Sequence, residues 1–451
     1  MALGRRKGKQ ESLWVSGKDL PRSAGHPFYS ALEKVLVAGD FDRFVEDLCA
    51  EHYAKRQGRP SIPPGMYFRM LFVGYFEGMT SQRGIAWRCQ DSLSIRDFLG
   101  LGVTEHSPDH SSMTVIRKRL PFEIFEAVFR FVLECAQEQG LLKGKTVAVD
   151  ATFLEANAAM KSIVRRDTGE SWGEYIKRLA EEEGVENPSD DDARRLDRKR
   201  KKSVSNEDWV SKTDPDSRIA KMKDGRTHLA YKAEHAVDLE TDLVIAASVY
   251  RADHSDYESL ACTLDDANEH LATVEEDLAI EDAVMDKGYH AVETLVECEH
   301  RGIRTYIPER RAARRRNWKN KPAASERAFR ANRRRVRGPR NAGLQRRRSE
   351  YVERTFAHSC ETGGGRRSHL RGVYDVGKRW LCQLAARNLG VLVRSVTGVG
   401  TPRGHQPKGV SASRLSRAMN TLIRLQRGAT TLVAVGWPLP IHRGAALAPQ
   451  R

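Results

Sequence analysis

A change in the spacing of apolar residues near Lys143 constrains the fold of this chain more than any other feature of its sequence. Before this point, apolar residues recur at spacings of three and four, as in residues 41–53 and 66–75, which predicts helices. After it, short apolar or alternating runs are separated by helical segments, which predicts a mixed sheet flanked by helices. The sequence therefore predicts an all-α region followed by an α/β region.

The all-α region has the order of elements expected of a helix-turn-helix-like DNA-binding region. Expected helices span residues 41–53, 66–75, 81–89, 94–99, 113–120 and 122–138. The helix at 113–120 carries Arg117, Lys118 and Arg119 after the turn-rich SPDHSS, so these three side chains are candidates for DNA contacts. The alternative, that they form a solvated helix face, stays open.

The α/β region has an order of strands and helices that matches the ribonuclease-H-like plan. Expected strands span residues 146–151, 228–237, 243–250, 283–286 and 304–308. Helices are expected at 257–271 and 291–300, with a closing helix near Glu353. This order predicts an α/β fold with a mixed five-stranded sheet flanked by helices, in which the first and fourth strands are neighbours.

We expect four successive regions and two insertions. The regions are a flexible N-terminus (1–27), a helical DNA-binding domain (28–141), a catalytic domain (142–395) and a basic, largely flexible tail (396–451). The insertions lie near residues 155–224 and 309–345. The first has an acidic and then a basic stretch with little apolar periodicity, so we expect most of it to be mobile.

Positive charge is concentrated in one stretch of the chain. The net charge is +16, and residues 309–348 contain seventeen Lys or Arg but only two acids, a local excess of +15. Such a stretch is typical of a polyanion-binding surface or of a solvated loop. Arg333, Arg334 and Arg335 in this stretch are candidates for DNA contacts.

The composition argues against a membrane or exported protein. The chain has no run of about 18 apolar residues, and its basic N-terminus lacks the apolar stretch of a secretory signal. The seven cysteines lie far apart without a metal-binding spacing, as expected of reduced thiols. We therefore expect a cytoplasmic protein.

Two aspartates end apolar strands. Asp150 closes TVAVDATF and Asp286 follows AVM in AVMDKGYH. Each alone is more often a cap or turn former. In the predicted sheet, however, the two carboxylates share a site and repel each other unless a cation lies between them.

A third acid comes from RRRSEYVERTF, which offers both Glu350 and Glu353. If Val352 and Phe356 anchor this helix to the sheet, Glu353 lies beside the anchored face, whereas Glu350 points toward solvent. Carboxylate oxygens suit Mg²⁺ or Mn²⁺, and two such ions can activate water or a 3′ hydroxyl and neutralise charge on a phosphate.

Five segments together resemble the bacterial insertion-sequence transposases of the DDE superfamily: VAVDAT, VMDKGY, YVERTF, RRSHLRG and LAARNLGVL. The resemblance runs from about Asp42 to Val393. It implies a ribonuclease-H-like core, magnesium dependence, double-stranded DNA with terminal inverted repeats as substrate, and Asp150, Asp286 and Glu353 as the catalytic and metal-binding acids. A homodimer on DNA, with a nucleoid-associated location in a bacterium, is also expected.

This sequence departs from the family pattern around the third acid. Many relatives carry Tyr and Arg before the Glu and Lys after it, where this chain has Arg346, Ser349 and Cys360. Phosphate contacts are therefore expected from the arginines that follow ETGGG, because arginine matches phosphate oxygens well. These candidates are Arg366, Arg367 and Arg371.

The expected function is cleavage at the ends of an insertion sequence and transfer of the 3′-OH strands into target DNA. A ribonuclease-H-like nuclease without strand transfer is one alternative. A transposase-derived DNA-binding protein that has lost catalysis is another.

Overall fold

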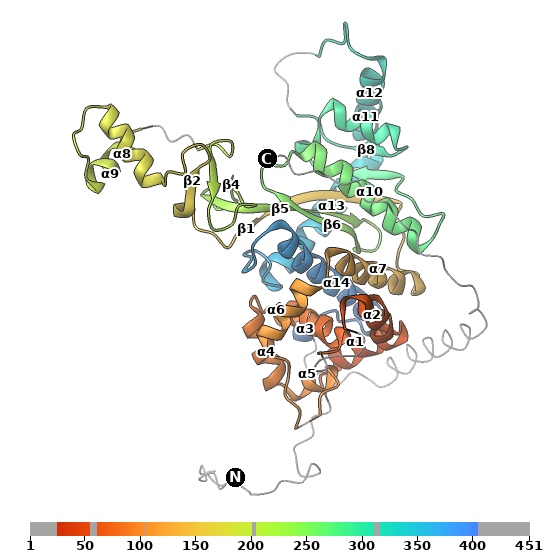
Figure 1. The fold of residues 1–451 in the computed structure, drawn as a ribbon. Helices are drawn as coiled ribbons and strands as arrows, with labels where there is room; N and C mark the ends of the chain where they lie inside the picture. Colours follow the sequence, from red (N-terminus) through yellow and green to blue (C-terminus); the bar gives the residue numbers. More distant parts are fainter. Residues whose placement is uncertain (1–24, 55–60, 103, 201–203, 311–315, 405–451) are drawn as a thin grey trace, which may run out of the picture. The chain divides into compact units, whose positions relative to one another are not determined.

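The computed structural model describes residues 25–54, 61–102, 104–200, 204–310 and 316–404 (Figure 1). The flexibility expected for residues 1–24 and for the tail from residue 405 falls outside these ranges. In the described part, buried apolar side chains form one hydrophobic core that extends from Phe28 to Val393. No helix in these ranges combines the length and the apolar character needed to cross a membrane.

The N-terminal region is helical, as predicted. Its helices are α1 (Pro27–Ala38), α2 (Phe41–Cys49), η1 (Ala50–His52), α3 (Pro64–Phe76), α4 (Gln82–Asp91), α5 (Leu93–Phe98), α6 (His110–Arg119) and α7 (Phe122–Glu138). Local chemistry sets several starts: the Ser81 hydroxyl accepts a hydrogen bond from the Gly84 amide, and the Asp109 carboxylate accepts one from Ser111. Helix α1 was not predicted separately.

A mixed sheet follows, and its order is β4-β5-β1-β7-β8, with β6 also paired to β5. The strands are β1 (Thr146–Glu155), β4 (Arg218–Lys221), β5 (Thr227–Asp238), β6 (Val244–Arg251), β7 (Asp282–Val284) and β8 (Arg304–Tyr306). Strand β5 runs antiparallel to β1, and β7 runs parallel to it on the other side. The five predicted strands are confirmed, and the first and fourth are neighbours. The expected sheet lacked β4, which lies in a polar segment and pairs with the first residues of β5.

Helices cover both faces of this sheet (Figure 1). Neighbouring residues on a strand point to opposite faces. On β5, Glu234 faces Ser259 of α10 (Asp256–Val274), whereas His235 stacks on Phe356 of α13 (Pro339–Phe356) at 4.1 Å between ring centroids. Helix α10 therefore covers one face of β5, and α13 covers the other.

Helix α14 (Val373–Thr397) joins the sheet to the N-terminal helices. It packs against β6 on one side and against α7, α3 and α1 on the other. The Asn388 side chain bonds both the amide and the carbonyl of Val244 on β6, at 2.9 and 2.7 Å. Seventeen of its residues are buried, so α14 is a central element of the core.

Most of the described residues between 155 and 224 form regular structure, contrary to the expectation of a mostly mobile insertion. The segment contains η2 (Met160–Ser162), β2 (Ile163–Arg165), α8 (Trp172–Glu182), α9 (Asp190–Lys199) and β3 (Trp209–Ser211). Capping boxes at Ser171 and Ser189 start the two helices. Trp172 and Tyr175 pack on Trp209, with ring centroids 5.1 and 5.3 Å away, and Trp209 belongs to the main hydrophobic core.

The second expected insertion, residues 309–345, is also partly helical. Helix α12 (Ala323–Arg337) packs against α11 (Val292–His300) and β8. Helix α13 begins within the same stretch, at Pro339, and continues through a single π-helical segment, η4 (Ala357–Thr362). The remaining short helices are η3 (Lys287–Tyr289) and η5 (Pro402–Gly404).

Candidate active site

The structure brings Asp150 and Asp286 into one pocket. Strands β1 and β7 pair in parallel as far as Ala148 and Val284, and each aspartate lies two residues further along its strand direction. Both side chains line an open pocket of about 830 Å³. The adjacency expected from the strand order is therefore present.

The Asp150 carboxylate is three-quarters buried and has two partners. Its Oδ2 lies 2.6 Å from Nη2 of Arg348, which belongs to α13, and its Oδ1 accepts a hydrogen bond from the Ala151 amide at 2.8 Å. Burial raises the pKa of Asp150, Arg348 lowers it, and repulsion from Asp286 raises it further, with a net upward shift. The two carboxylates are thus close enough to repel each other.

Asp286 is held by the turn that it begins. Its Oδ1 accepts a hydrogen bond from the Gly288 amide at 2.6 Å, which caps η3. A Cβ at position 288 would lie 2.7 Å from the same oxygen, closer than real Cβ contacts. Glycine at this position therefore permits the orientation of the Asp286 carboxylate.

Glu353 lies on α13, where Val352 and Phe356 are buried against the sheet as expected, and Glu350 pairs with Arg354. The Glu353 side chain itself is exposed, and it is not among the residues that line the pocket. Across the described ranges, no group of three or more His, Cys, Asp or Glu is close enough to hold a metal ion. The structure therefore places two of the three predicted acids together and leaves the third outside.

A different glutamate, Glu361 in η4, lines the pocket. It pairs with Arg366 at 2.8 Å, and the Arg366 guanidinium also donates to the Thr152 hydroxyl and the Phe153 carbonyl on β1, both at 3.2 Å. Glu361 was not predicted as a pocket residue, because a π-helical turn has no periodic pattern that places its residues on a known face.

Electrostatics make this pocket suitable for a cation. Among its described lining residues, six carboxylates face four Lys or Arg side chains. The carboxylates belong to Asp150, Glu155, Asp224, Asp256, Asp286 and Glu361, and the cations to Lys221, Lys223, Lys232 and Arg366. The excess of oxygen donors with negative charge matches the preference of Mg²⁺ and Mn²⁺.

Comparison with protein families decides what kind of domain holds this pocket. A family model described as "Transposase DDE domain" matches residues 143–389, which is more than half of the chain and includes Asp150, Asp286 and Glu353. The chain belongs to the DDE-domain transposases. A second model, "Transposase domain (DUF772)", matches residues 20–119. No curated protein and no solved structure matches the chain.

The predicted DNA contacts on α6 of this transposase differ in exposure. Lys118 and Arg119 are exposed, and Arg119 lies over the Tyr53 ring at 4.6 Å. Arg117 is buried and pairs with Asp375 of α14 at 3.2 Å. Because its guanidinium is held inside the fold, we do not retain Arg117 as a DNA contact.

The arginines of α12 also divide into surface and packed positions. Arg333 and Arg334 are exposed, although Arg333 pairs with Glu309 at 2.7 Å. Arg335 is half-buried and donates to the carbonyl and hydroxyl of Thr305 on β8, so it connects α12 to the sheet. Burial lowers the pKa of Arg335.

The three arginines after ETGGG differ in their position relative to the pocket. Arg366 lines the pocket itself. Arg367 is exposed and lies 3.7 Å from Glu155, and Arg371 is exposed and donates to the Asn157 carbonyl at 3.3 Å. Of these three candidates, Arg366 is the one that lines the pocket with Asp150 and Asp286.

Proposed function

We propose that this transposase cleaves DNA at the ends of an insertion sequence and transfers the 3′-OH strands into target DNA in a metal-dependent reaction. The observation that carries the proposal is the meeting of Asp150 and Asp286, from neighbouring parallel strands of a transposase DDE domain, in one carboxylate-rich pocket. Strand ends of this kind commonly carry the sites of α/β proteins.

The donor set fits a hard divalent cation. Asp150 and Asp286 supply carboxylate oxygens in one pocket, and their mutual repulsion is relieved by a positive charge between them. We propose Mg²⁺ or Mn²⁺, two ions in the active complex, with Glu353 as the third acid. Such ions, when bound, supply Lewis acidity and lower the pKa of water.

The protein's own side chains position the DNA. Arg366 is fixed on the pocket wall by Thr152 and Phe153, and its fork geometry suits a phosphate group. Arg348 must leave Asp150 when a cation binds there, because both compete for the same oxygen. Glu353, the third acid of this proposal, follows Arg348 by five residues on the same helix, α13.

The remaining basic residues are proposed DNA contacts outside the pocket. Lys118 and Arg119 on α6 would contact the terminal inverted repeats, and Arg333 and Arg334 on α12 would contact phosphates with strong salt dependence. Two element ends must be joined, so we propose a homodimer in the DNA complex. Its DNA substrates would place the protein at the bacterial nucleoid.

One observation favours a second candidate, a transposase-derived DNA-binding protein without catalysis. Arg348 already neutralises Asp150, and Glu353 is outside the pocket. A protein that has lost cleavage would keep end binding but would have no use for a third acid at the pocket.

Cleavage of DNA that flanks the coding sequence tests the proposal. We expect Mg²⁺-dependent cuts by the wild-type protein, followed by strand transfer, which a simple nuclease lacks. Asp150→Asn and Asp286→Asn should each reduce cutting by roughly a thousandfold, because metal catalysis supplies several kcal/mol. End binding should remain within about threefold, since the contacts on α6 are untouched. Unchanged cutting by Asp150→Asn would reject the assignment, and wild-type binding without cutting would favour the second candidate.

A further inference from the structure

A buried lysine forms part of the wall of the carboxylate-rich pocket. Lys232 lies on β5, directly opposite Phe153 of β1, and its side chain is 4% exposed. It lines the same pocket as Asp150 and Asp286. Lysine is rarely buried unless its charge is paired, so its partners decide what it does there.

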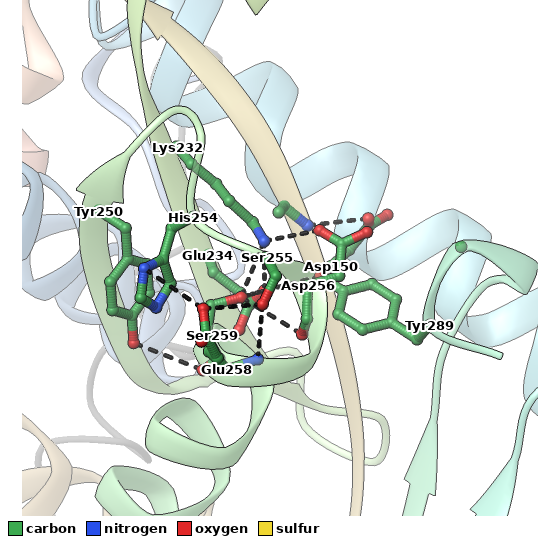
Figure 2. Close-up of polar contacts among 12 residues, drawn as sticks. Asp150, Lys232, Glu234, Tyr250, His254, Ser255, Asp256, Glu258, Ser259 and Tyr289 are labelled. Atoms are coloured by element: carbon green, nitrogen blue, oxygen red, sulfur yellow. Dashed lines mark hydrogen bonds and ion pairs between the residues drawn. The ribbon is translucent and has the colours of Figure 1, made fainter. Parts of the chain in front are cut away.

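The Lys232 ammonium is oriented by two hydrogen bonds (Figure 2). Its Nζ donates to Asp256 Oδ1 at 2.6 Å and to Ser259 Oγ at 2.8 Å, and it lies 3.7 Å from Glu234 Oε2. An ammonium group has three N–H donors. Within the described ranges, the third finds no hydrogen-bond acceptor.

Glu234 holds this arrangement in place from behind. Its carboxylate is fully buried and accepts hydrogen bonds from Ser259 at 2.9 Å, Thr263 at 2.7 Å and Tyr289 at 2.8 Å. Tyr289 belongs to the turn that begins at Asp286, and Glu234 lies opposite Ala151, the residue after Asp150. One network therefore connects the lysine to both carboxylate-bearing segments, as Figure 2 shows for Lys232, Glu234 and Tyr289 beside Asp150.

Fold stability alone is a poor explanation of this buried charge. Burying an ion pair costs desolvation energy that the mutual attraction only partly offsets, and apolar residues of similar size often stabilise a fold better. By contrast, a cation held in fixed orientation beside the reacting atoms lowers the cost of orienting a charged substrate. Because Lys232 lines the pocket, the network can orient its ammonium toward a charged substrate there.

We propose that Lys232 donates its third N–H to a non-bridging oxygen of the scissile DNA phosphate, and that Glu234, acting through Ser259, positions it. The inference rests on the proposed cleavage at Asp150 and Asp286 and names one phosphate contact of that site. Glu234 does not touch the substrate and is a positioning residue.

A double-mutant cycle, with one change in the protein and the other in the DNA, tests the contact. The probe is the flanking duplex that the wild-type protein cuts, with either the natural phosphate or an uncharged methylphosphonate at the cut position. Binding is measured in Ca²⁺ by fluorescence anisotropy, with wild-type protein and Lys232→Met. A charge-assisted hydrogen bond of this kind corresponds to roughly ten- to hundredfold in affinity. We expect each change alone to weaken binding by that factor, and both together to weaken it no further.

Lys223→Met is the matched control, because Lys223 carries the same charge in the same pocket but makes no bond to Glu234 or Ser259. For Lys223→Met combined with the methylphosphonate, we expect the loss of affinity to equal the product of the two separate losses. The same result for Lys232→Met, with the two losses independent, would overturn the proposed contact. Equal coupling for both lysines would also overturn it, since it would show a response to net pocket charge and not to one hydrogen bond.

Lys232→Met leaves Glu234 buried without its cation, so this variant can fail to fold. The double variant Lys232→Gln/Glu234→Gln removes both charges, and it carries the same cycle once its thermal melting matches that of the wild type. Failure of the wild-type protein to cut any flanking duplex rejects the proposed function. Cutting without coupling at Lys232 rejects only this inference.

Discussion

Two aspartates in this molecule pair with arginines of the same helix, α13, but they differ in how many cations surround them. Asp242, in the turn between β5 and β6, is 4% exposed and pairs with Arg354 of α13 and with Arg387 and Arg394 of α14. Asp150 pairs with Arg348 alone and borders an open pocket. The first carboxylate is saturated by protein cations, whereas the second keeps room for other ligands. The difference separates a structural ion cluster from a candidate active site.

The largest expected effect comes from Asp242→Asn. The buried guanidinium of Arg387 would lose its partner, at 2.5 Å in the wild type, while asparagine tolerates the left-handed backbone at φ 69°. Removing one partner of a buried pair costs about 3–5 kcal/mol of unfolding free energy. Urea denaturation measures this loss. The control is Glu240→Gln at an exposed position, for which we expect a loss of about 0.5 kcal/mol or less. A loss under about 1 kcal/mol would show that Asp242 does not need its arginines, which would remove the contrast with Asp150.

The packing of α13 between these two aspartates predicts acid sensitivity. His235 is fully buried against Phe356, and burial lowers its pKa to about 3 from an ordinary value near 6.5. The unfolded chain therefore binds a proton at His235 more readily than the folded chain does. The stability that the neutral, buried His235 contributes is complete above pH 6.5 and is lost as the pH falls toward 3. At pH 5 the loss is about 2 kcal/mol.

His235→Phe should remove that part of the pH dependence between pH 7 and pH 5, as measured by urea denaturation at both values. Exposed His300→Gln serves as the control and should leave the dependence in place. An unchanged slope in His235→Phe would mean that the contact between α13 and β5 opens to water in solution.

A smaller effect is expected from Arg348→Gln. This change removes the cation that competes for Asp150, so affinity for Mn²⁺ should rise by about tenfold, as expected for the loss of one close opposite charge. The exposed neighbour Arg347→Gln should change it by about twofold or less, because its charge is screened. Isothermal titration calorimetry measures both. Equal effects of the two substitutions would show that Arg348 acts only through net charge, and would contradict a direct competition between Arg348 and the metal for Asp150.

The sequence predicted the frame of the site because that frame depends on local patterns. Short continuous apolar runs located β1 and β7, and the strand order of the resembling family placed Asp150 beside Asp286. The anchoring of α13 through Val352 and Phe356 also followed from helical periodicity. Each of these inferences uses residues that are close in sequence or strands that are neighbours in a known plan.

Contacts between distant residues could not be predicted in the same way. Arg117 was read as a surface cation because its partner, Asp375, lies 258 residues away. The position of Lys232 beside the two aspartates was not predicted for the same reason: its hydrogen-bond partners, Asp256 and Ser259, come from α10. The helices between residues 155 and 224 were not predicted, although α8 has apolar residues at helical spacing in Trp172, Tyr175, Ile176 and Leu179, because the charged stretches around them dominate the composition of this segment.

The central claim is that Asp150, Asp286 and Glu353 hold the metal together, and Mn²⁺ binding to acid variants tests it most directly. Electron paramagnetic resonance counts bound Mn²⁺ in the full-length protein with flanking DNA, with Glu361→Gln as the matched control from the pocket wall. We predict that Asp150→Asn, Asp286→Asn and Glu353→Gln each weaken binding by about tenfold or more, while Glu361→Gln binds like the wild type. Wild-type affinity in Glu353→Gln, with the loss appearing in Glu361→Gln, would contradict the claim and assign the third position to the π-helical turn.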